Sequence, residues 1–268
     1  MIRLPAVAGQ FYPADGEELR SLIAGMSSPV AAVKPYRALA AVVPHAGYVY
    51  SGAVAAQTFQ RIEIPPVVVV TGPNHHGIGA DLALMREGCW RMPMGEVNIN
   101  SALADNLLGG EVFSADYTAH LKEHSLEVQI PFLQYFSGEL EIVPICASYI
   151  TYAQCRRAGE ELARAIEAWP QPVLMVASTD MTHYESRKIA SRKDSLALDC
   201  IKNLDPEALY DTVIREKISM CGFIPVTIVL TAAVLLGASR AELVRYTDSG
   251  EVSGDIAQVV GYAGLIVS

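Results

Sequence analysis

The sequence has few charged residues and no basic segment. Lys, Arg, Asp and Glu make up 18% of its 268 residues, and the formal net charge is −9. Lys and Arg are scattered rather than clustered, so the basic stripe typical of nucleic-acid-binding proteins is missing. We therefore expect no nucleic acid among the partners of this protein.

Paired cysteines are also missing. The five cysteines are Cys89, Cys146, Cys155, Cys200 and Cys221. Their number is odd and no CxxC pair occurs, which argues against a disulfide framework and a zinc finger. Residues 1–5 lack the apolar core of a signal peptide. Together these features favour a reducing compartment, and we expect a cytoplasmic protein.

One uncharged run, residues 218–239, is long enough on length alone to cross a bilayer. Gly222 and Pro225 interrupt its start, and no basic flank anchors both ends. The run therefore predicts a buried helix that begins near Pro225, and we expect no membrane association.

Internal repeats, low-complexity tracts and Ser/Gly linkers are absent, whereas 51% of the residues are hydrophobic. Apolar periodicity predicts helices at residues 15–26, 52–62, 101–108, 125–136, 153–168, 189–203 and 205–215. It predicts strands at residues 38–43, 66–70, 142–147, 173–177, 243–247 and 257–267. This alternation favours a single α/β domain over residues 1–268, with a mostly parallel sheet covered by helices on both faces.

Three predicted strands run directly into histidine. Residues 38–43 lead to His45, residues 66–70 to His75 and His76, and residues 173–177 to His183; the whole chain has six histidines. In an open α/β sheet, ligands gather beyond the carboxyl ends of the strands. A metal ion is the natural reason to bring imidazoles together.

The strand ends leave several assignments open. His45 is either a metal ligand or a structural hydrogen-bonding residue. Tyr48 and Tyr50 lie on or near the same loop, and one of their hydroxyls is a candidate to line a substrate pocket. Adjacent residues point in different directions, so one of His75 and His76 faces the site. We favour His75 as the ligand, although the spacing does not choose between them.

The segment from Glu123 to Glu127 predicts the start of a helix. Ser125 fits a helix cap, and acidic groups are favourable there. Alternatively, Glu123 or Glu127 orients a metal-binding imidazole. His124 is a candidate for substrate contact.

Asp180 and His183 form a candidate pair of orienting carboxylate and base, or of metal ligands. Ser178 raises the alternative of a Ser-His-Asp hydrolase, but no G-x-S-x-G elbow occurs in the sequence. Cys221 precedes the predicted uncharged helix, whose N-terminus would favour a thiolate. The alternative for Cys221 is a buried small hydrophobe.

These segments together resemble the Memo family, whose prokaryotic members are also called AmmeMemoRadiSam system protein B. The matching segments are residues 8–13, 44–52, 72–76, 123–127, 178–184, 221–222, 254–255 and 260–264. The resemblance implies the fold of class III extradiol dioxygenases, non-haem iron enzymes that cleave catechol rings. It also implies a functional link to a radical-SAM protein.

By this resemblance, His45 and His75 would be imidazole ligands of the metal, and Cys221 would occupy the third position, where the dioxygenases have a carboxylate. His183 would match their acid/base histidine, with Asp180 orienting an imidazole. We expect Fe(II), with Cu or Zn as alternatives, in an oxidoreductase of unknown substrate. A non-catalytic metal-handling or peptide-binding protein is the alternative, and a Cys221 thiol enzyme is a third reading.

Overall fold

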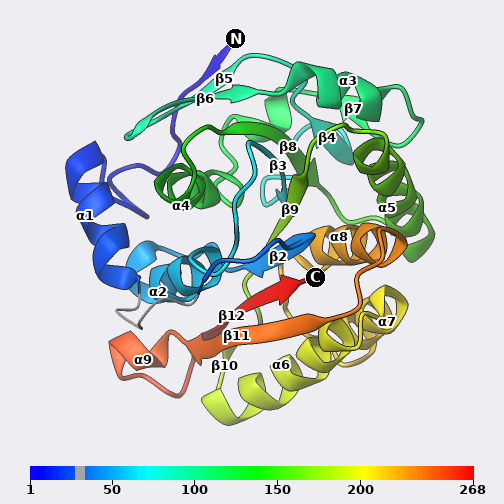
Figure 1. Cartoon of the computed structure of the whole chain (residues 1–268). Coiled ribbons are helices and arrows are strands. Elements are labelled where there is room, and N and C mark those ends of the chain that lie inside the picture. Colours follow the sequence, from blue (N-terminus) through cyan, green and yellow to red (C-terminus); the bar gives the residue numbers. More distant parts are fainter. Residues whose placement is uncertain (28–33) are drawn as a thin grey trace.

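Four parallel strands form the centre of the fold (Figure 1). The structure is a computed structural model that describes residues 1–27 and 34–268. Side by side lie β8 (Glu141–Ala147), β3 (Val67–Pro73), β9 (Val173–Ser178) and β2 (Ala40–Val43). Because these four strands are parallel, the segments that follow them all begin at the same edge of the sheet.

Shorter and antiparallel strands extend this centre on both sides. In the described part of the chain the strands form one twelve-stranded sheet. Beyond β2 lie β12 (Val259–Val267), β11 (Ala241–Asp248) and β10 (His183–Glu185). Beyond β8 lie β6 (Gly95–Ile99), β5 (Cys89–Met92) and β1 (Ile2–Arg3), while β4 (Leu82–Leu84) and β7 (Ser114–Ala115) pair off the main path. The sequence did not predict β1, β4, β5, β6, β7 or β10, because such short segments carry little periodicity.

The central strands are buried on both faces, which explains their continuous runs of Val. Val67 and Val69 pack into one core, whereas Val68 and Val70 pack into the other. The first core is covered by α3 (Ser101–Leu108), α5 (Tyr152–Glu167), α6 (Arg187–Lys202), α7 (Pro206–Arg215) and α8 (Phe223–Leu235). The second is covered by α1 (Gly16–Met26), α2 (Tyr48–Phe59) and α4 (Ile130–Phe136). The predicted α/β class and the mostly parallel sheet with helices on both faces are confirmed.

Two predicted helix starts are wrong, and both lie beside the candidate site. The helix predicted from residue 52 begins at Tyr48, with Gly47 as its N-cap. The helix predicted from Ser125 is replaced by a 3₁₀ turn over Glu127–Gln129 that leads into α4. Most other predicted elements begin and end within a few residues of the observed ones.

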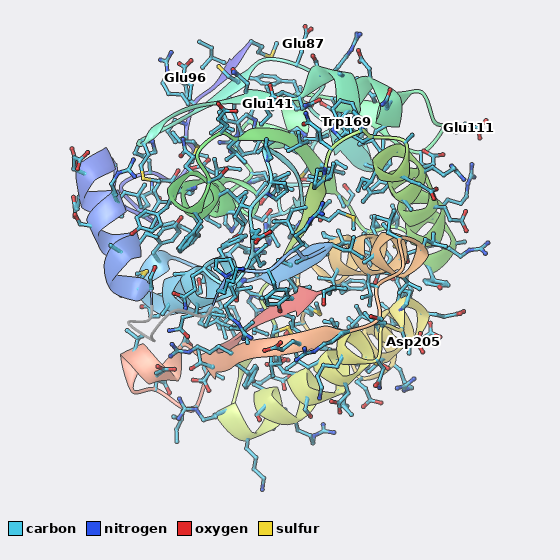
Figure 2. All side chains as sticks on the ribbon, viewed as in Figure 1. Glu87, Glu96, Glu111, Glu141, Trp169 and Asp205 are labelled. Atoms are coloured by element: carbon cyan, nitrogen blue, oxygen red, sulfur yellow. The ribbon has the colours of Figure 1, made fainter. Side chains whose placement is uncertain are left out.

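The uncharged run forms α8, a helix of 13 residues that is buried over most of its length. Among the described residues, no helix combines the length and apolarity needed to span a membrane. Side chains fill the space on both faces of the sheet, and the exposed carboxylates of Glu87, Glu96, Glu111 and Asp205 lie at the periphery (Figure 2).

Candidate metal centre

Three candidate ligands converge at the carboxyl edge of the central strands. His45 follows β2 and His75 follows β3, and these two strands flank β9. Cys221 precedes Gly222, the N-cap of α8. One ring nitrogen of His45, one of His75 and the Sγ of Cys221 all lie within 4.8 Å of one another. The fold thus brings together residues that are far apart in the sequence.

His45 is buried and held at three points. Its backbone N–H donates to Asp180 Oδ1 at 2.8 Å, and its Nδ1 lies 3.0 Å from Ser178 Oγ. Its Nε2 lies 3.2 Å from Cys221 Sγ. Burial, with smaller contributions from His124 and His75, lowers the pKa of His45 well below the ordinary value. The imidazole is therefore neutral, the form that binds a metal.

His75 is held by a single carboxylate. Its Nδ1–H donates to Glu123 Oε1 at 2.8 Å, and its backbone N–H donates to Oε2 at 2.7 Å. Oε1 also accepts the Ser125 backbone N–H. Burial acts to raise the pKa of Glu123, but the His75 and Ser125 hydrogen bonds outweigh it and hold that pKa below its usual range. Glu123 is therefore an ionised side chain that orients His75.

His76 lies outside the cluster. Its side chain is exposed, and its Nε2 bonds the backbone carbonyl of Lys122 at 3.0 Å. The structure thus separates the two adjacent histidines and places His75 beside His45.

The three residues fit a transition metal. Both imidazoles are engaged through Nδ1, which leaves Nε2 of each ring to offer a lone pair. Metal-binding histidines usually have their other ring nitrogen held in this way. Two imidazoles and one sulfur suit iron, copper or zinc.

The position of Cys221 before α8 predicts a thiolate, but its surroundings favour the protonated thiol. Burial, followed by the nearby Asp180 charge, raises the pKa of Cys221. Without a metal, the helix N-terminus is too weak to produce the expected thiolate. A metal ion would have to displace the thiol proton, as thiolate ligation generally requires.

His124 is a third imidazole at the centre. Its ring stacks on His75 with 4.7 Å between centroids, and meets His45 edge-on at 5.5 Å. Phe11 lies on another side at 5.0 Å. Burial lowers the pKa of His124 to about 4, so the ring is neutral at pH 7. His124 thus lines the site beside both candidate ligands.

Asp180 and His183 have separate partners. His183 is half-buried, and its Nδ1–H donates to the backbone carbonyl of Ser219 at 2.9 Å. Asp180 bonds the backbone of His45, and its Oδ2 lies 4.0 Å from His45 Nε2. Burial raises the pKa of Asp180 to about 6. The Nδ1 of His45 is held by Ser178, and the hydrogen bond of Asp180 to His45 is made to its backbone N–H.

The two tyrosines after His45 differ in their surroundings. The Tyr48 hydroxyl donates to Val128 O at 2.7 Å, and its ring stacks on Phe132. Tyr48 is therefore a core residue whose hydroxyl is already engaged, and it does not offer that hydroxyl to a substrate pocket as expected. Tyr50 is 42% exposed.

Sequence reasoning missed the residues that hold the imidazoles in place. The sequence suggests Ser178 only as a nucleophile, and nothing in it points to Ser219 or to Gln129, which donates to Ser178 Oγ. The one signal in the sequence is that Ser178 directly follows the strand predicted at residues 173–177, at the same edge as His45.

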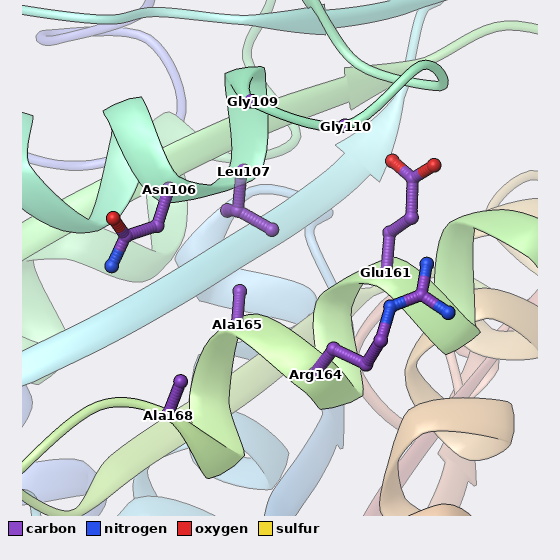
Figure 3. A pocket seen from close by; sticks show the side chains of 8 residues that line it. All are labelled: Asn106, Leu107, Gly109, Gly110, Glu161, Arg164, Ala165 and Ala168. Atoms are coloured by element: carbon purple, nitrogen blue, oxygen red, sulfur yellow. The ribbon is translucent and has the colours of Figure 1, made fainter.

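A cavity of about 490 Å³ lies elsewhere, between the end of α3 and α5 (Figure 3). Asn106, Glu161 and Arg164 supply its polar lining. The Glu161 carboxylate already accepts the backbone N–H groups of Glu111 and Val112. This cavity holds no candidate ligand of the metal centre, so its size alone does not make it a site.

Known proteins match this sequence over almost its whole length. The family model described as Memo-like protein matches residues 3–266. MEMO1 family protein MK0963 from Methanopyrus kandleri is 42% identical over 99% of both chains, and a MEMO1 family protein from Methanosarcina mazei is also 42% identical over 99% of both. A MEMO1 family protein from Aquifex aeolicus is 40% identical over 99% of this chain and 98% of its own.

Among solved structures, the uncharacterized protein JW3007 from Escherichia coli K12 superimposes with a TM-score of 0.58. The two share 14% sequence identity over 86% of this chain and all of the other, so the likeness shows a common fold. The match of the family model and the full-length relatives establish the family itself. This chain belongs to the Memo family.

Proposed function

We propose that this protein binds one transition-metal ion through His45, His75 and Cys221 and uses it in a redox reaction. The observation that carries the proposal is the convergence of their donor atoms within 4.8 Å. Fe(II) is the first candidate, with Cu and Zn as alternatives, because imidazole and thiolate suit all three.

The number of donors favours catalysis over a structural role. Structural zinc sites are closed by four protein ligands, whereas catalytic sites use three and leave a position open. The cluster has three. A bound iron or copper ion would supply Lewis acidity and one-electron chemistry at the open position.

The surrounding side chains can bind and move protons. The Ser219 carbonyl holds Nδ1–H of His183, which leaves Nε2 of that ring to take up or return a proton. His124, neutral at pH 7, adds a second imidazole wall beside His75. The proposal therefore assigns proton transfer to His183 and substrate contact to His124 and Tyr50.

One observation favours the alternative of a metal-handling protein without turnover. The side chain of His75 is 31% exposed, so a ligand at the rim is open to exchange, and Cys221 is a soft ligand suited to Cu(I). A thiol enzyme is less favoured, because the raised pKa of Cys221 keeps its nucleophile protonated.

The test of metal binding is elemental analysis of protein purified without oxygen. We expect about one metal ion per chain in the wild type and loss of that metal in a folded His45→Ala variant. His76→Ala is the matched control, because His76 lies one residue from a ligand but outside the cluster. Equal metal content in the wild type and His45→Ala would refute the assignment.

Oxygen uptake separates the two functions. The iron-loaded protein is mixed with a panel of catechols, and His183→Gln is measured beside the wild type. Uptake that falls in His183→Gln while the metal content stays constant would support an oxidoreductase. A loaded protein that consumes no oxygen with any catechol would favour metal handling.

A further inference from the structure

Ser178 has a fully determined set of hydrogen bonds at the metal centre. It is the last residue of β9 and is completely buried. Its Oγ lies 2.6 Å from the Ser125 carbonyl oxygen, 2.8 Å from Gln129 Nε2 and 3.0 Å from His45 Nδ1. Three polar partners thus surround one hydroxyl that has a single proton to donate.

The number of available protons identifies the donor and the acceptor in each of these hydrogen bonds. The Ser125 carbonyl can only accept, so it takes the Ser178 proton. Gln129 Nε2 also lies 2.9 Å from the Pro44 carbonyl, which requires the amide nitrogen at that position. Gln129 therefore donates to Ser178. With its proton committed, Ser178 Oγ can only accept from His45, so the proton of the neutral imidazole must sit on Nδ1.

We infer that Ser178 is a positioning residue that locks His45 in the Nδ1–H tautomer. The lock leaves the Nε2 lone pair directed toward Cys221 Sγ, 3.2 Å away. A neutral imidazole has two tautomers, and the one with its proton on Nε2 has no lone pair to offer a metal there. The inference rests on the proposed function only in taking His45 as a ligand.

The two candidate imidazole ligands are thus held by different chemistry. The Nδ1–H of His75 meets the carboxylate of Glu123, whereas that of His45 meets the hydroxyl of Ser178. A neutral acceptor fixes the tautomer without adding charge near the buried Asp180 and the thiol. We therefore expect the loss of this hydroxyl to change the tautomer of His45 and leave that of His75 unchanged.

The tautomers are measured by ¹⁵N NMR of metal-free protein labelled at histidine, near pH 7.5. The proteins compared are the wild type, Ser178→Ala, Ser178→Thr and the control Thr71→Val. Thr71 is equally buried on the adjacent strand β3, but its hydroxyl donates to the backbone carbonyl of Val176. We expect His45 to carry its proton on Nδ1 in the wild type, Ser178→Thr and Thr71→Val, and to populate both tautomers in Ser178→Ala.

Zinc affinity, measured by chelator competition, supplies a second readout. We expect Ser178→Ala to bind zinc about 10- to 100-fold more weakly and Thr71→Val to bind as the wild type does. A wild-type His45 with its proton on Nε2, or an unchanged tautomer in Ser178→Ala, would overturn the inference. The wild-type spectrum decides this even if Ser178→Ala fails to fold. A wild type with the expected tautomer that binds no metal would instead overturn the proposed function.

Discussion

The segment from Glu123 to Glu127 borders two buried polar clusters that use their hydrogen-bonding groups in opposite ways. In the first, called the arginine cluster, Glu127 accepts bonds from Arg3, Tyr12 and the backbone N–H groups of Ala6 and Val7, at 2.5–3.0 Å. Arg3 is fully buried and also donates to the carbonyls of His120 and Glu123. The carboxylate and guanidinium are thus well supplied with partners inside the protein.

In the candidate metal centre, by contrast, the Nε2 atoms of the imidazoles have few hydrogen-bond partners in the part of the chain that the structure describes. Among the described residues, the Cys221 thiol is the one hydrogen-bond partner of His45 Nε2, although both imidazoles are firmly held through Nδ1. A thiol is only a weak hydrogen-bonding partner for a buried imidazole nitrogen. Saturation is typical of a structural element, as in the arginine cluster, whereas the weakly engaged nitrogens of the candidate metal centre support its proposed role as a ligand site.

We expect the largest loss of stability from a substitution that breaks the arginine cluster. Glu127→Ala leaves the buried guanidinium of Arg3 without its counter-charge, so we expect a loss of about 3–5 kcal/mol in the free energy of unfolding. Urea denaturation measures this loss. The folded fraction should still bind metal at wild-type stoichiometry, and loss of metal from folded Glu127→Ala would show that the two clusters are not separate.

Low pH should lower the free energy of unfolding through His120, whose backbone carbonyl accepts a hydrogen bond from Arg3. Burial, then the charge of Arg3, lowers the pKa of His120 from 6.5 to about 4. The unfolded chain therefore binds this proton more readily, so the stabilisation is complete above pH 6.5 and is lost as the pH falls toward 4, by about 3 kcal/mol. His120→Gln, which can keep the donor to the Ala83 carbonyl, should remove this contribution.

Unfolding free energies between pH 4 and 7.5 check this expectation. The exposed His76→Gln variant is the control, and its curve should run parallel to that of the wild type. A His120→Gln curve that is also parallel to the wild type would show that His120 does not titrate as its burial requires.

We expect Glu123→Gln to lower both the free energy of unfolding and the zinc affinity. The amide keeps the shape of the carboxylate but places a donor against the donors of His75 and Ser125, so we expect about 1–3 kcal/mol of destabilisation. Zinc affinity should fall about 10- to 100-fold, because His75 loses its orienting charge. Calorimetric titration of the folded variant with zinc measures the affinity, and an unchanged value would separate Glu123 from the metal centre.

The sequence predicts that His45 and His75 come together, because both follow buried strands and strand ends meet at one edge of a parallel sheet; the structure confirms that the two rings are neighbours. It did not predict that β9 lies between β2 and β3, which pairs Val43 with Ser178. The order of strands in a sheet depends on long-range packing, and no local pattern encodes it. The partner of His45 was therefore missed.

The choice between Glu123 and Glu127 also required the structure. In a regular helix the two residues would lie on the same face, and either would suit an imidazole. The backbone instead is irregular at Glu123 and turns at Ser125–Leu126 before the 3₁₀ segment, so the carboxylates diverge toward His75 and Arg3. Arg3 is more than a hundred residues away in sequence, which placed this contact beyond any analysis of spacing.

The most direct test of the account is X-ray absorption at the metal edge of the zinc-loaded protein, comparing the wild type with Cys221→Ser. The account predicts one sulfur at about 2.3 Å and imidazole nitrogens at about 2.0–2.1 Å in the wild type. In Cys221→Ser the sulfur should disappear. The stability of the metal-free protein should change by about 1 kcal/mol or less, because only weak thiol contacts are lost there. A wild-type metal without sulfur, or a sulfur that remains in Cys221→Ser, would contradict the assignment of this centre.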